Sequence, residues 1–266
     1  MKVLIVGYGN MGKTYANSFI SSRFIKPQDI YVLVRNQNYN APESSIPKSN
    51  FLFSASENIG DFDIVILAVK PQDFEFLAQS IQPFLKDSQI VFSVMAGIAI
   101  AKLESRLSCS KVVRSMPNIP TQIGMGMTVF TASASVDRKE LFIIQNLINT
   151  TGKSVYVEDE KLINAATAIS GSGPAYVFYF MKSMIQAAVD LGFNESEAEL
   201  LVNQTFMGSV AIQNSYSLSN EEWIAKVASK GGTTESALKV FENGILENTI
   251  IDAVKAANHR AAELGS

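Results

Sequence analysis

Short runs of apolar, β-branched residues alternate with helical stretches through the first half of the chain, and this alternation restricts the fold more than any other feature. The runs suit strands that are buried on both faces. They lie at residues 2–7, 30–34, 62–69, 89–96, 111–116, 126–132 and 154–157. The segments between them that suit helices are 11–23, 74–84, 100–107 and 138–150. Such alternation with short loops predicts a mostly parallel, doubly wound sheet.

At about Glu158 the β-branched runs give way to long stretches rich in Ala, Leu, Met, Glu and Lys. This pattern, with cues such as "GFNESEAE" and "GGTTES" that suit helix ends and caps, favours helices. They are expected at residues 176–191, 195–215, 220–228, 234–243 and 248–264. The sequence therefore predicts an α/β Rossmann-like N-terminal domain over residues 1–158 and an all-α C-terminal domain over residues 159–266.

The composition excludes several classes of protein. With 47% hydrophobic and 18% charged residues, the chain has the make-up of a globular protein with a core. The net charge of −3 argues against nucleic acid as a partner. The single cysteine, Cys109, permits no intrachain disulfide, and no histidine lies near it in its serine-rich turn. No apolar run is long enough to span a membrane, so we expect a cytoplasmic protein without a membrane partner.

Gly7, Gly9 and Gly12 form a G-x-G-x-x-G motif directly after the first strand and at the start of a helix. The first glycine permits a tight turn, the second lets a pyrophosphate approach the backbone, and the third lets the helix pack against the strand. The helix N-terminus adds partial positive charge. The motif predicts a dinucleotide site, with a purely structural turn as the alternative. The residues assigned to it are Gly7, Tyr8, Gly9, Asn10, Met11 and Gly12.

The end of the second strand bears on which dinucleotide binds. A site that prefers NAD commonly places Asp or Glu there, for the ribose 2′-hydroxyl. Here the strand runs into Arg35, Asn36, Gln37 and Asn38, with no acid. Arg35 and Asn36 can bind a 2′-phosphate by charge and hydrogen bonds. NADPH is therefore favoured and NADH is possible, with a solvated Arg35 as the alternative interpretation.

Two further segments follow strands at the edge where ligands gather in open α/β sheets. They are "AVKPQ" after the third strand and "MAG" after the fourth. Lys70 can assist with its charge or be an ordinary surface lysine. The residues expected to face the coenzyme are Ala68, Val69, Lys70, Pro71, Met95 and Ala96. No residue is assigned to a metal.

Five segments stand in a characteristic order along the chain: "GYGNMG" (7–12), "AVKPQ" (68–72), "RSMPNIP" (114–120), "ISGSGPAYVFYF" (169–180) and "SKGGTTESAL" (229–238). As a set, and from end to end of the chain, they resemble the pyrroline-5-carboxylate reductase family. The resemblance implies an NAD(P)H-dependent oxidoreductase that reduces 1-pyrroline-5-carboxylate to L-proline, the last step of proline biosynthesis. It also implies that the helical domain binds substrate and forms an interlocked homodimer, with higher oligomers possible, so that a second chain completes the site.

Two positions depart from the pattern that is common in this family. Lys230 stands where proline is frequent, and Ile119 stands where threonine is frequent. Lys230 removes a rigid φ and adds a charge. That charge can assist a bound anion or simply face water.

The chain offers no obvious catalytic acid or base. Its only histidine, His259, falls in the last predicted helix, and residues 174–180, which directly follow the "SGSG" segment, contain no lysine. An imine substrate removes this difficulty, because a protonated C=N carbon is already electrophilic and accepts hydride directly. A hydroxyl is enough to support the ring nitrogen, and the resemblance assigns that role to Thr234. A plain helix N-cap is the other interpretation of Thr234.

The carboxylate of such a substrate needs hydrogen-bond donors. Backbone N–H groups at the helix N-terminus around "SKGGTT" provide a cradle with a favourable dipole. The residues assigned to the substrate are Ser229, Gly231, Gly232, Thr233 and Thr234. By resemblance, the "SGSGP" segment (170–174) lines the pocket, although close helix packing is an alternative for its glycines. Asn118 is expected to shape the nicotinamide pocket.

Two rival functions stay open at this point. One is a reductase or dehydrogenase of the same fold that acts on another imino or hydroxy acid. The other is a non-catalytic NADP-binding regulator. The regulator is disfavoured because the "SKGGTT" loop keeps its serine, both glycines and both threonines.

Overall fold

The computed structural model describes residues 1–36 and 44–264, and it divides into two compact units. The first unit comprises Met1–Ser172 together with the chain from Ala257 onward, and the second comprises Gly173–Ala256. Each unit is described by itself below. The functional boundary expected between residues 158 and 159 stays a prediction.

In the described residues, eight strands form one sheet in the order β3-β2-β1-β4-β5-β6-β7-β8. All neighbouring pairs are parallel except β6 and β7. The first six strands have the order 3-2-1-4-5-6 of dinucleotide-binding sheets, which confirms the predicted fold class. The strands are β1 Val3–Val6, β2 Ile30–Leu33, β3 Phe51–Leu52, β4 Ile64–Leu67, β5 Ile90–Ser93, β6 Val112–Met116, β7 Gly126–Ala132 and β8 Gly152–Tyr156.

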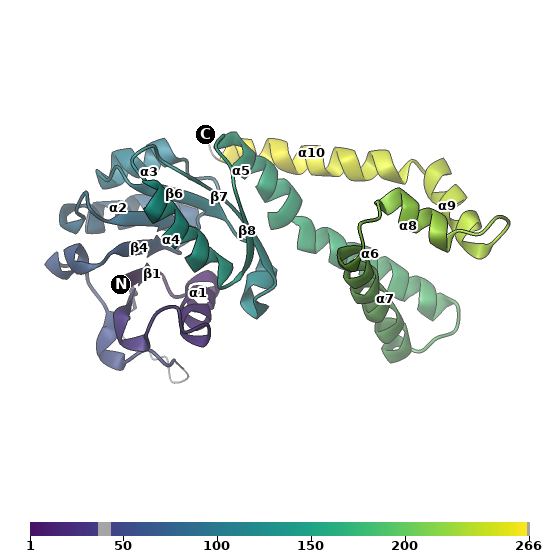
Figure 1. Ribbon diagram of the computed structural model, residues 1–266, viewed down its shortest axis with the longest axis horizontal. Coiled ribbons are helices and arrows are strands. Elements are labelled where there is room, and N and C mark those ends of the chain that lie inside the picture. Colours follow the sequence, from purple (N-terminus) through teal and green to yellow (C-terminus); the bar gives the residue numbers. More distant parts are fainter. Residues whose placement is uncertain (37–43, 265–266) are drawn as a thin grey trace. The chain divides into compact units, whose positions relative to one another are not determined.

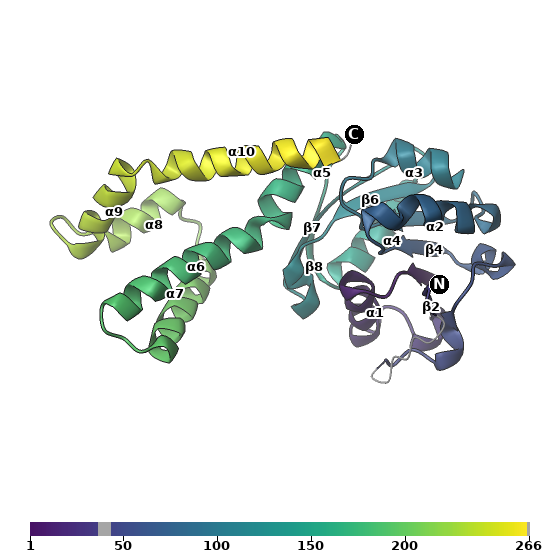
Figure 2. The same cartoon turned by 180° about the vertical axis from the view of Figure 1, so that it is seen from behind.

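Helices cover both faces of this sheet (Figures 1 and 2). On one face, α1 (Asn10–Ser21) and α4 (Arg138–Asn149) pack on a cluster that includes Val3 and Ile5. On the other, α2 (Phe74–Ile81) and α3 (Ile100–Leu107) pack on a cluster that includes Leu4 and Val6. Alternate residues of β1 therefore face opposite layers. This explains why the strand is apolar throughout.

The helix expected over 74–84 ends early. α2 stops at Ile81, and Gln82–Phe84 forms a short 3₁₀ turn. Pro83 is the cause, because proline has no N–H to donate and disfavours helical geometry in the residue before it. The prediction was therefore wrong for the last turn.

The C-terminal part is helical, as predicted. The first unit contains α5 (Lys161–Ala166), which the sequence did not predict, and a π-turn at Thr167–Gly171. The remaining helices are α6 (Gly173–Asp190), α7 (Glu195–Ser215), α8 (Asn220–Val227), α9 (Thr233–Asn243) and α10 (Leu246–Leu264). α7 and α8 each begin with a reciprocal capping box, Asn194 with Glu197 and Ser219 with Glu222. No described helix combines the length and apolarity that a membrane crossing requires.

Cys109 is a core residue, although the sequence around it reads as a polar turn. Its side chain is buried among Leu107 and Val112, and its thiol faces the carbonyl oxygen of Gln89 at 3.6 Å. Burial raises the pKa of the Cys109 thiol. The raised pKa disfavours the reactive thiolate.

Candidate functional site

The three glycines of the N-terminal turn have three different surroundings. Gly7 has φ +92°, and a Cβ there would lie 2.7 Å from the carbonyl oxygen of Ala68. A Cβ on Gly12 would collide with the carbonyl oxygen of Gly7. A Cβ on Gly9 would meet nothing within 4 Å. The first and third glycines are therefore needed for the fold, whereas Gly9 keeps open space at the start of α1.

That open space is suited to a phosphate. Gly9 is the N-cap of α1, and no side chain caps the helix there. The first N–H groups of a helix have no intrahelical acceptor and carry partial positive charge. The turn therefore fits the pyrophosphate of a dinucleotide.

A cavity of about 550 Å³ opens at the carboxyl ends of β1, β2 and β4. β2 and β3 lie on one side of β1, and β4, β5 and β6 lie on the other. Ligands bind in such sheets where the strand order changes side in this way. Five residues that the sequence assigned to the coenzyme line this cavity: Gly7, Tyr8, Arg35, Asn36 and Val69. Gln37 and Asn38, which were part of the same argument, lie outside the described residues.

The other residues assigned to the coenzyme lie near this edge without lining the cavity. Pro71 begins a 3₁₀ turn, Pro71–Asp73, and Lys70 precedes it with an exposed side chain. The side chain of Met95 is buried in the core, so only its backbone can face a ligand. Ala96, by contrast, is exposed.

Among the lining residues that sequence reasoning missed are Phe53, Asp73 and Phe76. Asp73 lies two residues beyond Pro71, and its carboxylate Oδ1 is 3.8 Å from Nη1 of Arg35. Proximity to the "AVKPQ" segment was the only sequence signal for it. The described residues that directly follow β2 contain no acid, as the sequence analysis noted. The loop after β4 supplies one to the same cavity, Asp73.

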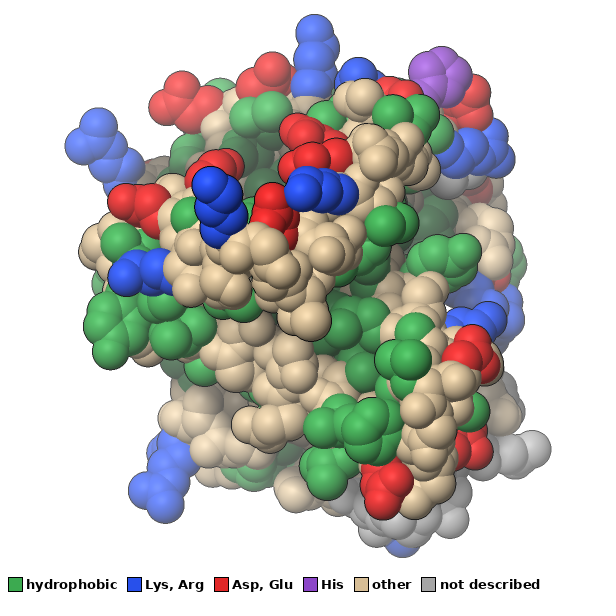
Figure 3. Space-filling model, turned by 90° about the vertical axis from the view of Figure 1, so that its right-hand side faces the viewer, with side chains coloured by type: hydrophobic (Ala, Val, Ile, Leu, Met, Phe, Trp, Pro, Cys, Tyr) green, Lys and Arg blue, Asp and Glu red, His purple; other side chains and the backbone are tan. Residues whose placement is uncertain are grey.

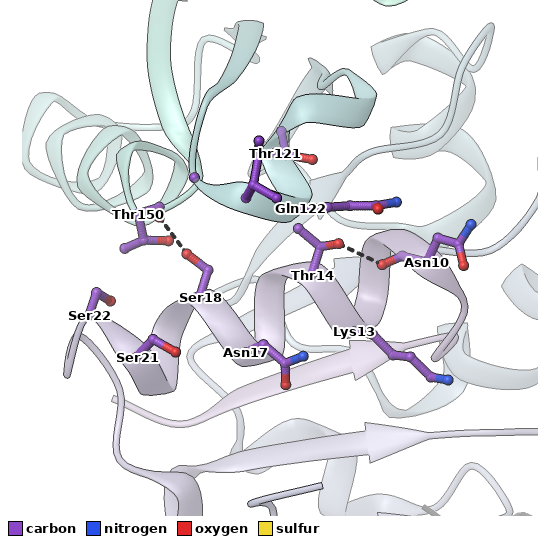
Figure 4. Close-up of a pocket in the computed structure, with 12 residues that line it drawn as sticks. Asn10, Lys13, Thr14, Asn17, Ser18, Ser21, Ser22, Thr121, Gln122 and Thr150 are labelled. Carbon is purple, nitrogen blue, oxygen red and sulfur yellow. Dashed lines mark hydrogen bonds between the residues drawn. The ribbon is translucent and has the colours of Figure 1, made fainter. Parts of the chain in front are cut away.

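A second cavity of about 640 Å³ lies between the exposed face of α1 and the 3₁₀ turn Ile119–Ile123 (Figure 4). The hydroxyl of Thr14 donates to the carbonyl of Asn10 at 2.8 Å, and that of Ser18 donates to the carbonyl of Thr150 at 2.5 Å. Among the described residues of its lining, Lys13 is the one that carries a charge. Of the residues that the sequence assigned to the coenzyme, Asn10 is in the lining of this cavity.

Asn118 connects two of the motifs that the sequence analysis singled out. Its Nδ2 donates to the carbonyl of Ser170 at 3.1 Å, and its Oδ1 accepts the N–H of Met127 at 2.9 Å. Ser170 belongs to the π-turn, and a Cβ on Gly171 would lie 2.7 Å from Cε of Met116. Gly171 is thus packed closely at the carboxyl end of β6, whereas a Cβ on Gly173, the other glycine of "SGSG", would meet nothing within 4 Å. Such π-turns are frequent at functional sites.

The "SKGGTT" loop lies in the second unit. Gly231 has φ +73°, a left-handed conformation that favours glycine, and the loop then enters α9 at Thr233. Gly232 is the N-cap, so the interpretation of Thr234 as the N-cap was wrong. Gly231 and Gly232 form the turn before α9, so Thr233 is the first residue of the helix and Thr234 is the second.

Two of the four cradle N–H groups already have partners. The N–H of Gly231 donates to the carboxylate of Glu235, and the N–H of Gly232 donates to the carbonyl of Ser229 at 2.9 Å. Glu235 also pairs with Lys239 at 2.9 Å, and this pair, followed by the Gly231 contact, lowers the pKa of its carboxyl. The N–H groups of Thr233 and Thr234 fall in the first turn of α9, where the helix itself offers no acceptor. They are the donors best placed to hold an anion.

His259 lies on the exposed surface of α10, and its Nδ1 is 3.1 Å from a carboxylate oxygen of Glu263. This contact spans one turn of the same helix and is a surface feature. The position agrees with the expectation that His259 decorates a helix.

Comparison with known proteins covers the whole chain. A family model described as pyrroline-5-carboxylate reductase dimerisation matches residues 160–264, and one described as NADP oxidoreductase coenzyme F420-dependent matches residues 2–97. The pyrroline-5-carboxylate reductase of Aquifex aeolicus is 32% identical over 99% of this chain and 97% of its own length. That of Pseudomonas aeruginosa is 37% identical over 79% of this chain and 78% of its own length.

Solved structures give the same result. A pyrroline-5-carboxylate reductase from Coxiella burnetii matches with a TM-score of 0.89 and 30% identity, covering all of this chain and 98% of that one. A pyrroline carboxylate reductase from Plasmodium falciparum, solved with NADP bound, matches with a TM-score of 0.87 and 29% identity over the same shares. A prephenate dehydrogenase from A. aeolicus, at 18% identity and a TM-score of 0.52, shares the fold alone.

Proposed function

The chain belongs to the pyrroline-5-carboxylate reductase family, and from this premise we propose that it reduces 1-pyrroline-5-carboxylate to L-proline with NADPH. The observation that carries the proposal is the 32% identity with the A. aeolicus reductase over nearly the full length of both chains. The reaction completes the biosynthesis of proline. The rival functions, another acid substrate or a non-catalytic regulator, are not favoured by a similarity of this extent.

The N-terminal unit holds the coenzyme in this proposal. NADPH, when bound, supplies the hydride. The space at Gly9 and the N–H groups that begin α1 receive the pyrophosphate. Arg35 and Asn36 lie in the cavity at the end of β2 and bind the adenosine end, where the charge of Arg35 favours a 2′-phosphate. The backbone of residues 68–71 and 95–96 lines the path along the sheet edge.

The second unit binds the substrate. The N–H groups of Thr233 and Thr234 and the hydroxyl of Ser229 bind the carboxylate, with support from the helix dipole. The hydroxyl of Thr234 meets the imine nitrogen. Because a protonated imine needs no further activation, the chain contributes orientation rather than a strong acid or base.

We further propose that the chain works as a homodimer with interlocked helical domains, in which a second copy completes the substrate site. The match of residues 160–264 to a dimerisation model supports this. So does the exposure of large apolar side chains on α6 and α7, among them Phe178, Tyr179 and Leu200. Figure 3 shows hydrophobic side chains gathered in several groups on one face of the molecule. Light scattering that finds a stable, active monomer would contradict this part of the proposal.

The test of the activity is kinetic. Purified protein is given 1-pyrroline-5-carboxylate with NADPH or NADH, and proline is quantified together with coenzyme oxidation. We expect turnover with both and the higher kcat/KM with NADPH. Hydroxy acids with NADP⁺ serve as the control for the rival class of substrate. Turnover of hydroxy acids without proline formation would overturn the proposal.

The cellular location is part of the same proposal. A single, buried cysteine suits a reducing compartment, and we place the activity in the cytoplasm. Fractionation with antibody detection checks this.

A further inference from the structure

The described wall of the cavity at the carboxyl ends of β1, β2 and β4 carries one positive and one negative charge. Among its described lining residues, Arg35 is the one cation and Asp73 is the one anion. Their charged groups approach to 3.8 Å, and their side chains are 81% and 43% exposed. The two charges come from different loops, one after β2 and one after β4. Any group that binds Arg35 must therefore lie close to Asp73 as well.

This balance matters for coenzyme choice. A 2′-phosphate carries negative charge, and it is attracted by Arg35 and repelled by Asp73. A 2′-hydroxyl carries no charge, and a carboxylate can accept its hydrogen bond. The aromatic side chains of Phe53 and Phe76 line the same cavity. They do not discriminate between NADPH and NADH, because the adenine base is identical in the two coenzymes. Among the described lining residues, the charges that distinguish the two ligands are those of Arg35 and Asp73.

The next acid along the described chain, Glu75, is already paired with two cations. Glu75, two residues beyond Asp73, lies 3.5 Å from Nζ of Lys102 and 3.0 Å from Nε of Arg106. Asp73 has Arg35 as its counter-ion, and its side chain does not cap α2. Its charge is therefore the one that a phosphate on Arg35 would encounter.

We propose that Asp73 is a specificity-determining residue that opposes the 2′-phosphate at Arg35, so that the enzyme keeps the use of NADH beside NADPH. The inference rests on the proposed function for its coenzyme site and extends it to a residue outside the glycine turn and the end of β2. Removal of the Asp73 charge leaves Arg35 fully available to the phosphate. NADPH binding then improves, and NADH binding does not.

The test measures coenzyme binding without substrate, by isothermal titration calorimetry, on the full chain. Asp73→Asn keeps the size of the side chain and removes its charge. Asp87→Asn is the matched control, because Asp87 is exposed and lies three residues before the start of β5, whereas the cavity lies at the carboxyl ends of the strands. Since the Arg35–Asp73 pair is exposed, we expect the Kd of NADPH to fall about two- to fivefold in Asp73→Asn, and that of NADH to change less than twofold. The gain should shrink as ionic strength rises.

Three results would overturn the inference: an unchanged Kd for NADPH, an equal shift for both coenzymes, or the same gain in Asp87→Asn. Failure of the wild-type protein to bind either coenzyme would overturn both this inference and the proposed coenzyme site. A shifted Kd ratio in a protein that does not reduce 1-pyrroline-5-carboxylate would instead leave the inference standing and refute the proposed reaction.

Discussion

Arg114, buried on β6, places its Nη1 2.7 Å from Oε1 of Glu160, and the same carboxylate oxygen accepts the N–H of Ile100 at 2.8 Å. Nη2 of Arg114 also donates to the side-chain oxygen of Asn164 at 3.0 Å. One carboxylate thus joins the sheet, the start of α3 and the segment that leads into α5. The side chain of Arg114 is only 5% exposed, so its charge depends on this partner.

Loss of Glu160 should therefore destabilise the fold. Glu160→Ala leaves a buried guanidinium without its carboxylate, and the free energy of unfolding should fall by about 3 kcal/mol. Urea unfolding measures it. Asp61→Ala is the control, because Asp61 and Lys86 form an exposed pair with 4.0 Å between their charged atoms. Removal of this pair should lower the free energy of unfolding by less than about 1 kcal/mol. If both variants lose the same small amount of free energy of unfolding, the buried pair contributes no more stability than the exposed one.

The third and second glycines of the turn should separate folding from binding. Gly12→Ala places a Cβ against the carbonyl of Gly7 and should lower the free energy of unfolding by about 1–3 kcal/mol. Gly9→Ala meets open space in the protein and should fold normally, yet it should weaken NADPH binding about tenfold, equal to about 1.4 kcal/mol, by narrowing the room for the pyrophosphate. Thermal unfolding and calorimetry compare the two variants. Normal NADPH affinity in Gly9→Ala would mean that the phosphates bind elsewhere.

Removal of the Thr234 hydroxyl should affect turnover rather than the coenzyme. We expect Thr234→Ala to lower kcat at least about tenfold, since one positioned donor contributes about this much or more, while the Kd of NADPH stays within twofold. Thr234→Ser keeps the hydroxyl and should recover most of the rate. Thr233→Ala, at the preceding position of α9, is the neighbouring control. An unchanged kcat in Thr234→Ala would show that the hydroxyl takes no part in the reaction.

Stability should fall at alkaline pH partly because of Tyr15. Burial raises the pKa of its phenol above the ordinary value of about 10. The unfolded chain therefore loses this proton first, and the stabilisation present below pH 10 declines as the pH rises above it. Between pH 10 and 11 the wild type should lose up to about 1.4 kcal/mol more than Tyr15→Phe. Chemical unfolding at both pH values gives this difference, and identical pH dependence in the two proteins would refute the assignment.

Much of the fold could be predicted from the sequence because the buried strands are short, apolar and separated by helical segments. β3 was missed since it comprises two residues, Phe51–Leu52, too few to form a pattern. α5 was missed for a similar reason, because its six residues run into a π-turn without a stop signal. Length, more than residue type, decided which elements were visible.

The site was predictable where one local segment forms it, and not where distant loops meet. The roles of Gly7 and Gly12 follow from spacing alone and agree with the surroundings of each glycine. The approach of Asp73 to Arg35 depends on how two loops meet at the sheet edge, which no local pattern encodes. The capture of the Gly231 N–H by Glu235 depends on a side-chain conformation in the same way.

The reversal of the last two strands has a consequence for protein engineering. β7 and β8 run opposite to β6, so β8 starts at the end of the sheet where β6 finishes, the chain then reaches the opposite end, and it returns through α5 to Ser170 beside Asn118. The main chain thus crosses from the first compact unit into the second just after residue 172, without passing through a strand. A chimaera that takes residues 173–256 from a relative has both of its junctions between the two units, after residues 172 and 256, and every described strand of the sheet keeps its own sequence.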